Sequence, residues 1–213
     1  MKLYSYYRSS TSYRLRIALN LKGLNYAIVP VDLLGSEHKQ EAFRARNPSG
    51  GVPVLEAEGR NRAQSMAILE WLDERFPELP LLPADPESRF TVREFAYAIA
   101  TELHAPLNLK VLQYLKQELG QTQQAVDQWY LHWLAETLEP LEKRASSLPS
   151  GDFLVGQPGL FEAVLIPQLY NARRYGFDLA RVPHLARMEA ACLQLPAFVR
   201  AHPDNQPDTP NES

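Results

Sequence analysis

Short strand-like runs alternate with amphipathic helical segments near the start of the chain. Residues with strand propensity occupy 3–7, 26–31 and 52–56, and residues 62–64 form a short return strand after a Glu58-Gly59 turn. Apolar residues at helical spacing mark residues 15–21, 38–46 and 66–76, the second range most weakly. The predicted order of elements is therefore β-α-β-α-β-β-α, a small sheet covered by helices.

The remainder of the chain is predicted to be helical. Four prolines within residues 77–86 indicate a stiff linker that is not helical. After the linker, periodic apolar residues predict helices at 87–118, with a bend at Pro106, and at 126–141, 160–175 and 184–195. The last residues, HPDNQPDTPNES, are polar and rich in proline, so we expect them to be poorly ordered.

These patterns predict an α+β protein with two domains. The first is thioredoxin-like, because two strands linked by a crossover helix precede a hairpin and a final helix. The second is an all-α helical bundle. The predicted parts are a βαβαββα domain at 1–78, a Pro-rich linker at 79–88, an all-helical domain at 89–202 and a polar tail at 203–213.

The segment from residue 3 to residue 19 places a strand, a polar turn and a helix start side by side. Four consecutive hydroxyl residues follow the strand, namely Ser9, Ser10, Thr11 and Ser12. A helix N-terminus presents unpaired N–H groups and a partial positive charge, so this turn suits an anion. The hydroxyls could also serve only as a helix cap, and the nearby arginines could simply be solvated. Those arginines are Arg8, Arg14 and Arg16.

Composition narrows the class of protein. The chain has 213 residues, of which 45% are hydrophobic and 22% charged, as in ordinary globular proteins. A net charge of -3 argues against a nucleic-acid-binding face or a polybasic membrane patch. No apolar run predicts a signal peptide or a membrane span. Cys192 is the only cysteine, so we expect no intrachain disulfide and a cytoplasmic location, and the five histidines lack the spacing of a metal site.

Two further pairs of residues stand where predicted elements begin, and the first of them lies where a thioredoxin-like fold binds a peptide. Val52-Pro53 opens the third strand, and Gln64-Ser65 precedes the strongly patterned helix at 66–76. Ser65 and that helix start suit a carboxylate, and Gln64 suits an amine or amide. Each pair also has a plain structural interpretation. Pro53 could open an edge strand in the trans form, and Ser65 could be a simple N-cap.

The hydroxyl turn resembles the motif of the zeta-class glutathione transferases. The family pattern S-S-C-x-W-R-V-R-I-A-L aligns with Ser9-Ser10-Thr11-Ser12-Tyr13-Arg14-Leu15-Arg16-Ile17-Ala18-Leu19. Further matches are Asn47-Pro48 with VPVL, Gln64-Ser65 with AILEWLDERFP, LLPAD, Asn108-Leu109 with VLQYL, Pro167-Gln168 and Asn171-Ala172-Arg173-Arg174-Tyr175. The resemblance covers nearly the whole chain except the tail, and it implies the cytosolic glutathione transferase fold and a homodimer.

The resemblance implies that glutathione is the cofactor and gives roles to individual residues. Ser9 is expected to donate a hydrogen bond to the glutathione sulfur, with Thr11 and Ser10 as the other catalytic candidates. Val52, before a cis peptide bond to Pro53, is expected to pair with the cysteinyl unit. The remaining implied contacts are Gln64 and Ser65 with the γ-glutamyl end, His104 from the helical half, and either His38 or Gln40 with the glycyl carboxylate.

Zeta-class members include maleylacetoacetate and maleylpyruvate isomerases, so the resemblance implies cis-trans isomerisation of one of these keto acids in aromatic catabolism. A thiolate adds to the enedione double bond, the resulting single bond rotates, and the thiolate leaves. The substrate is a dianion, and arginine is well matched to carboxylates. The expected substrate contacts are Arg8, Arg174 and Asn108. The sequence does not distinguish the two substrates.

Two other functions are compatible with the same sequence. Glutathione conjugation, dehalogenation of α-halo acids or peroxide reduction would use the same thiolate. A non-catalytic interaction module would use only the fold, and the retention of Ser9, Gln64, Ser65 and both pocket arginines argues against it.

The chain also departs from the family pattern. Thr11 replaces cysteine, Tyr13 replaces tryptophan, and Ala105 separates His104 from Pro106. Gly159 and Glu162 stand where relatives carry a Ser/Thr-x-x-Asp capping box, so we expect only partial capping of the helix that follows.

Overall fold

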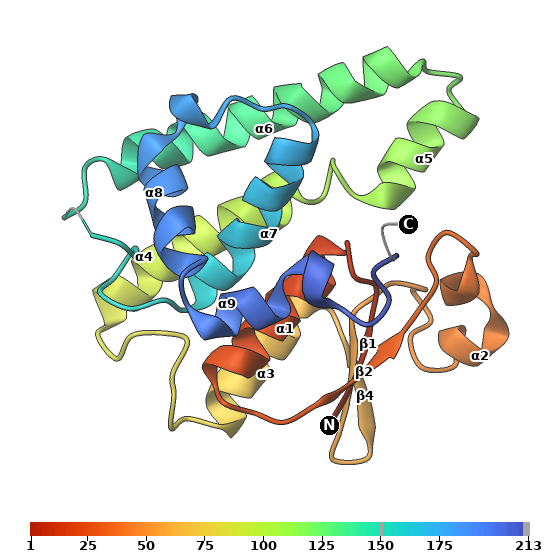
Figure 1. Ribbon diagram of the computed structural model, residues 1–213, viewed down its shortest axis with the longest axis horizontal. Coiled ribbons are helices and arrows are strands. Elements are labelled where there is room, and N and C mark those ends of the chain that lie inside the picture. The colour runs from red at the N-terminus through yellow and green to blue at the C-terminus, as the bar shows by residue number, and fades with distance from the viewer. Residues whose placement is uncertain (150, 211–213) are drawn as a thin grey trace. The chain divides into compact units, whose positions relative to one another are not determined.

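The computed structural model describes residues 1–149 and 151–210. The chain forms two compact units, one made of Met1–Leu82 with Leu193–Ser213 and the other of Pro83–Cys192 (Figure 1). The boundary between the two units, after residue 82, lies inside the Pro-rich segment expected from the sequence.

The first unit is built on a four-stranded sheet. Its strands are β1 (Lys2–Ser5), β2 (Ala27–Pro30), β3 (Val54–Ala57) and β4 (Arg60–Ala63), in the order β2-β1-β3-β4. β1 runs parallel to β2 and antiparallel to β3. Glu58 and Gly59 have φ values of 52° and 70°, which is the left-handed backbone that a two-residue hairpin turn between β3 and β4 requires. The thioredoxin-like order predicted from the sequence is confirmed.

Helices cover both faces of this sheet, because the side chains of successive strand residues point to opposite faces and those on both faces are buried. Tyr4 and Val54 are register partners, and the Tyr4 ring meets Phe43 of α2 (Glu41–Arg44) edge to face. Leu3 and Leu55, the neighbouring partners, point to the opposite face and are fully buried. Figure 1 shows α1 (Ser10–Leu21) and α3 (Ser65–Arg75) on that face and α2 on the other.

The C-terminal segment returns to the first unit. Helix α9 (Pro196–Ala201) packs along α1 (Figure 1). The contact is fixed by Arg16, which is 0% exposed and donates from Nε to the carbonyl oxygen of Ala201 over 2.9 Å. Its other guanidinium nitrogens donate to Ser5 Oγ and to the carbonyl oxygen of Tyr7. Arg16 is therefore not a solvated helix residue. Its buried guanidinium links α1 by hydrogen bonds to β1, to the turn that follows β1 and to the C-terminal segment.

The expected domain boundary at 202 and the expected poorly ordered tail at 203–213 need correction. The tail begins with a short 3-10 helix, Pro203–Asn205, followed by the buried Gln206, which donates to the carbonyl oxygens of Arg200 and His202. Asp208 accepts a hydrogen bond from the backbone nitrogen of Tyr7 over 2.8 Å. These long-range contacts order the polar residues up to 210, and residues 211–213 lie outside the described part of the chain.

The second unit is helical, as predicted. Its helical elements are α4 (Pro86–Tyr97), the π-helical η2 (Ala98–Leu103), α5 (Leu109–Gln117), α6 (Gln123–Ala145), α7 (Leu160–Arg174), η3 (Leu179–Arg181) and α8 (Pro183–Cys192). The single bent helix expected at 87–118 is wrong, because the chain leaves the helix around Pro106, which has no N–H to donate. Asn108 then caps a new helix by accepting from the backbone nitrogen of Lys110. The helix expected at 184–195 ends at Cys192, before α9 begins.

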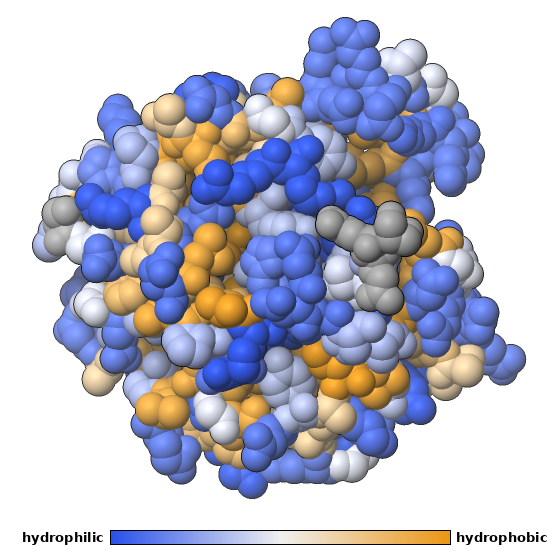
Figure 2. Space-filling view, viewed as in Figure 1, coloured by the Kyte–Doolittle hydropathy of each residue, from blue (hydrophilic) through white to orange (hydrophobic). Residues whose placement is uncertain are grey.

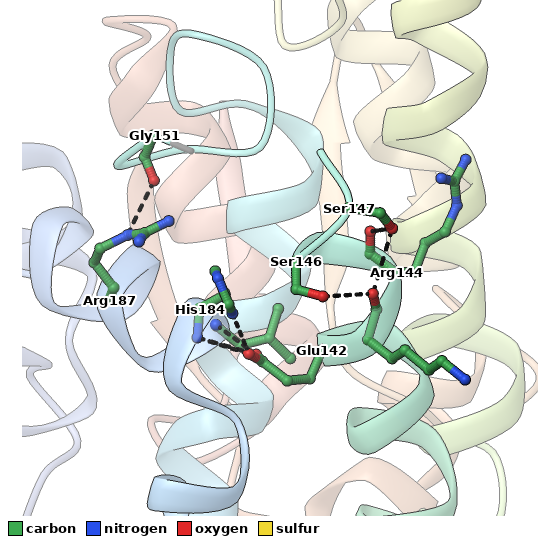
Figure 3. Close-up of polar contacts among 9 residues, drawn as sticks. Glu142, Arg144, Ser146, Ser147, Gly151, His184 and Arg187 are labelled. Atoms are coloured by element: carbon green, nitrogen blue, oxygen red, sulfur yellow. Dashed lines mark hydrogen bonds and ion pairs between the residues drawn. The ribbon is translucent and has the colours of Figure 1, made fainter. Parts of the chain in front are cut away.

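Two buried carboxylates cap helix starts in this unit. Glu142 of α6 accepts from the backbone nitrogens of His184 and Leu185, each at 3.0 Å, and from Nδ1 of His184, at the beginning of α8 (Figure 3). Glu162 of α7 accepts from the backbone nitrogens of Leu154 and Gly159 at 2.9 and 2.8 Å. The partial capping expected from Gly159 and Glu162 is confirmed, since glycine has no side chain to complete the box.

Across residues 1–149 and 151–210, no helix combines the length and the apolarity that crossing a bilayer requires. On the face drawn in Figure 2, apolar residues appear in groups between larger hydrophilic areas. The single cysteine, Cys192, is buried, and burial raises the pKa of its thiol.

Candidate functional site

Ser9 is the N-cap of α1. Its backbone is extended (φ −66°, ψ 118°), and its Oγ accepts a hydrogen bond from the backbone nitrogen of Ser12 over 3.2 Å. Ser10, the first residue of the helix, is buried, whereas Ser9 is half-buried. The capping interpretation of the hydroxyl turn is therefore correct, but it uses only the acceptor side of the Ser9 hydroxyl.

A directed chain of hydrogen bonds continues from Ser9. Thr11 Oγ1 donates to the carbonyl oxygen of Val52 over 2.9 Å, and a carbonyl oxygen can only accept. The single proton of the Thr11 hydroxyl is therefore used in the hydrogen bond to Val52, and Thr11 can only accept from other groups. The 3.0 Å contact between Ser9 Oγ and Thr11 Oγ1 then has Ser9 as its donor. The chain runs from the Ser12 N–H through Ser9 and Thr11 to Val52, so the Ser9 hydroxyl is held as a donor.

The loop that carries Val52 is held in place by hydrogen bonds from Asn47, the residue at which the loop begins. The Val52-Pro53 peptide bond is cis, as the resemblance implied. The buried Asn47 donates from Nδ2 to the carbonyl oxygen of Gly51 over 2.7 Å and accepts at Oδ1 from the backbone nitrogen of Ser49. Together with the Thr11 contact, these bonds fix the backbone that leads into β3.

The start of α3 differs from the prediction that Ser65 caps it. Gln64 occupies the N-cap position with φ 71° and ψ 104°, and no side chain caps the helix. Ser65 is the first helical residue, is buried, and accepts at Oγ from Nη1 of Arg14 over 3.3 Å. The N–H groups of the first turn of α3 are thus not satisfied by a cap.

Helix α1 joins these segments. Thr11 and Arg14 lie three residues apart and therefore on the same side of the helix. Thr11 holds the loop with the cis bond, and Arg14 holds the start of α3. The structure therefore links Ser9, Thr11, Val52 and Ser65 within the first unit.

Arg8 and His38, also in the first unit, have other surroundings. Arg8 is half-buried, donates from Nη2 to the Tyr6 hydroxyl over 3.2 Å and lies over the Tyr7 ring. His38 lies in the short η1 (Glu37–Lys39), and burial together with Lys39 and Arg44 lowers its pKa. No hydrogen bond in the described residues links its side chain to Ser9 or Ser65. Gln40, exposed before α2, remains the alternative contact for a glycyl carboxylate.

In the second unit, His104 and Asn108 form a polar group with Gln168. The two ring nitrogens of His104 face the Asn108 amide at 3.4 Å and the amide of the buried Gln168 at 3.3 Å. Sequence reasoning assigned no role to Gln168, although the Pro167-Gln168 match pointed to its position. His104 is therefore oriented from both sides.

Arg174 lies six residues after Gln168, near the end of α7. It is exposed, donates from Nη1 to Oδ1 of Asn171 over 3.3 Å, and its guanidinium lies 6.0 Å from the Tyr170 ring centroid. Tyr130 and Tyr175 stack nearby with ring centroids 3.5 Å apart, and burial raises the pKa of Tyr130 while Arg174 opposes that rise. An exposed guanidinium beside aromatic rings is available to a carboxylate.

Comparisons with known proteins identify the family of this chain. Residues 1–74 match the model of the glutathione S-transferase N-terminal domain. The maleylacetoacetate isomerase of Pseudomonas aeruginosa is 44% identical over 213 residues, which cover 99% of each chain.

Solved structures extend the likeness to the whole fold. The holo structure of a bacterial zeta-class maleyl pyruvate isomerase is 40% identical with a TM-score of 0.96, covering 99% of this chain and 100% of that one. Maleylacetoacetate isomerase from Anaeromyxobacter dehalogenans 2CP-1, with glutathione bound in its active site, is 44% identical with a TM-score of 0.87, covering 98% of this chain and 97% of that one. A second structure of it holds dicarboxyethyl glutathione and citrate there (42% identity, TM-score 0.86, coverage 99% and 94%). The chain therefore belongs to the zeta class of glutathione transferases, in the family of the maleylacetoacetate and maleylpyruvate isomerases.

Proposed function

We propose that this protein is a glutathione-dependent isomerase that converts maleylacetoacetate or maleylpyruvate into its trans isomer. The observation that carries the proposal is the directed chain from the Ser12 N–H through Ser9 and Thr11 to Val52. It keeps one hydroxyl as a donor at a helix N-terminus, which is the environment that favours a thiolate.

The residues of the first unit fit glutathione. Glutathione, when bound, would supply a thiolate that adds to one alkene carbon of the enedione, which converts the double bond into a single bond that can rotate, and expulsion of the thiolate would re-form the double bond. Ser9 would turn its hydroxyl proton from Thr11 to the sulfur, and the Thr11 hydroxyl would stay on the Val52 carbonyl oxygen. Val52 offers its backbone to the cysteinyl unit. Gln64 and the uncapped start of α3 at Ser65 receive the γ-glutamyl end.

The substrate contacts are Arg8, Asn108 and Arg174. The substrate is a dianionic keto acid, and guanidinium groups bind carboxylates through paired N–H donors. His104, oriented by Asn108 and Gln168, gives a further polar contact to glutathione. The zeta-class structure with dicarboxyethyl glutathione and citrate supports a site that receives glutathione together with carboxylates.

We further propose that the protein is a cytoplasmic homodimer. Phe90 and Tyr97 are 63% and 39% exposed on α4 and lie seven residues apart, so they share one side of the helix. A second copy would cover such a pair. Light scattering coupled to size-exclusion chromatography tests this, and a monomeric mass at micromolar concentration would contradict it.

The decisive experiment measures isomerisation of maleylpyruvate and of maleylacetoacetate by ultraviolet absorbance, with and without glutathione. We expect turnover that requires glutathione, and the ratio of the two kcat/KM values identifies the substrate. Glutathione binding without turnover of either keto acid would contradict the isomerase function and favour conjugation or dehalogenation, which an α-halo acid assay would detect. A lack of glutathione binding would favour a non-catalytic module.

A further inference from the structure

Two buried arginines of α1 differ in how their charges are satisfied. Arg16 donates from all three guanidinium nitrogens, to two carbonyl oxygens and one hydroxyl. Arg14 is 1% exposed and makes one contact, from Nη1 to Ser65 Oγ. Its Nε and Nη2 are buried and have no hydrogen-bond partner within residues 1–149 and 151–210. Arg14 is therefore much less satisfied than its neighbour.

The Arg14 charge also lacks a counter-charge. No ion pair in the described part of the chain includes it. Desolvation lowers the pKa of the guanidinium to about 10, and at that pKa it is still protonated at neutral pH. A buried cation with two unsatisfied donors is unfavourable for folding. The Arg14 charge therefore lowers the stability of the unliganded chain, and a bound anion would compensate it.

The position of Arg14 suits such an anion. A guanidinium can only donate, so Ser65 Oγ accepts from Arg14 and keeps its own proton for another partner. Ser65 begins α3, whose first turn has no side-chain cap, and Gln64 and Ala67 beside it are exposed. The helix dipole, the uncapped N–H groups, the Ser65 hydroxyl and the Arg14 charge together favour an anion that approaches from solvent.

We propose that Arg14 is a positioning residue that orients the Ser65 hydroxyl and supplies the buried counter-charge for the α-carboxylate of the γ-glutamyl unit of glutathione. This inference rests on the proposed role of Gln64 and Ser65 in glutathione binding. Arg14 does not itself touch the ligand. Through its charge and its hydrogen bond to Ser65, it makes the start of α3 selective for a charged carboxylate over a neutral group of the same shape. The unpaired Arg14 charge destabilises the unliganded protein, and a bound carboxylate offsets this effect.

Two ligands test the proposal independently of thiol chemistry: S-methylglutathione, and the same molecule with a carboxamide in place of the γ-glutamyl α-carboxylate. By isothermal titration calorimetry, we expect the wild type to prefer the carboxylate by roughly 10- to 100-fold. Arg14→Met is expected to reduce this preference to about threefold or less. In a Ser65→Ala background the part of the preference that depends on the orientation of the hydroxyl is already absent, so Arg14→Met should change the preference less than in the wild type, by the counter-charge alone.

Thermal unfolding distinguishes this role from a structural one. Removal of an uncompensated charge should leave the Tm of unliganded Arg14→Met unchanged or raised, whereas Arg16→Met should lower Tm because it loses three hydrogen bonds. A large fall in Tm or a failure to fold for Arg14→Met would overturn the proposal. An undiminished carboxylate preference in Arg14→Met would also overturn it, and the proposed enzymatic function would still stand.

The remaining outcomes separate the two proposals. If the wild type binds both ligands equally, the carboxylate does not lie at the start of α3, and the role of Arg14 is refuted while isomerase activity remains possible. If the wild type binds neither ligand nor glutathione, the proposed function fails together with the inference.

Discussion

The Thr11 hydroxyl donates a hydrogen bond to the backbone carbonyl oxygen of Val52 over 2.9 Å, which joins the first turn of α1 to the loop before β3. The zeta-class pattern has cysteine at this position. A thiol is a weak donor, whereas a hydroxyl is a good one, so threonine strengthens this link. We therefore propose that Thr11 has a positioning role in this chain and that Ser9 is the hydroxyl that donates to the thiolate.

Thr11→Val keeps the shape of the side chain and removes its hydroxyl. The Val52 carbonyl oxygen loses its donor and Ser9 loses its acceptor, so we expect a loss of about 1–2 kcal/mol in the free energy of unfolding. The glutathione Kd should rise roughly 3- to 10-fold because the loop is no longer fixed. Thr11→Ser retains the hydroxyl and serves as the control. Calorimetry and chemical denaturation measure both effects, and equal behaviour of the two variants would refute the role of the hydroxyl.

Ser9→Ala removes the proposed donor to the glutathione sulfur. We expect the pKa of the bound thiol to rise by roughly 1–2 units, because the thiolate loses its hydroxyl partner. The reaction rate should therefore fall at neutral pH and recover as pH rises through the new pKa. A pH titration of thiolate absorbance in the complex measures the shift. Ser9→Thr keeps both the cap and the donor, so a similar shift in that variant would contradict this explanation.

Adjacent arginines at the end of α7 should respond differently. Arg174 is exposed and is proposed to bind a substrate carboxylate, so Arg174→Ala should raise the substrate KM roughly 10- to 100-fold and leave the glutathione Kd nearly unchanged. Arg173 is paired with the buried Glu189, and that hydrogen bond raises the Arg173 pKa. Arg173→Ala should therefore lower Tm with little change in KM. Steady-state kinetics and thermal unfolding measure both, and equal loss of substrate and glutathione affinity in Arg174→Ala would make that residue structural.

Glu142→Gln tests the cap that α6 provides for α8. The carboxylate accepts from two backbone nitrogens and from the His184 ring (Figure 3). Glutamine offers a single uncharged oxygen, so we expect a loss of about 1.5–3 kcal/mol in the free energy of unfolding. Glu136→Gln changes an exposed residue of the same helix and should stay within about 0.5 kcal/mol. Urea denaturation compares them, and equal stability of the two variants would be the contrary result.

Local patterns were sufficient for most of the first unit. The strand propensity of residues 3–7 and 52–56 predicted strands, and the structure pairs Leu3 with Leu55 on one buried face and Tyr4 with Val54 on the other. The hydroxyls before an apolar helical face indicated a helix start, and the structure places its N-cap at Ser9. Such features depend on residues that are close in the sequence. The spacing of apolar residues along a strand or helix therefore indicates them directly.

Other features were decided only by the tertiary structure, because each depends on groups far apart in the sequence. From the sequence, Arg14 and Arg16 could be either solvated helix residues or part of an anion site, and only the structure places Ser65 and Ala201 beside them. The polar tail read as poorly ordered until Asp208 met the Tyr7 backbone.

The sequence by itself determined the order of the strands and helices, the hydroxyl turn and the family resemblance. Only the folded chain determined which buried polar groups are satisfied and which are not. A side chain's hydrogen-bond partners are set by packing between distant segments, and no periodicity in the sequence encodes that packing. That is why the uncompensated charge of Arg14 became visible only in the structure.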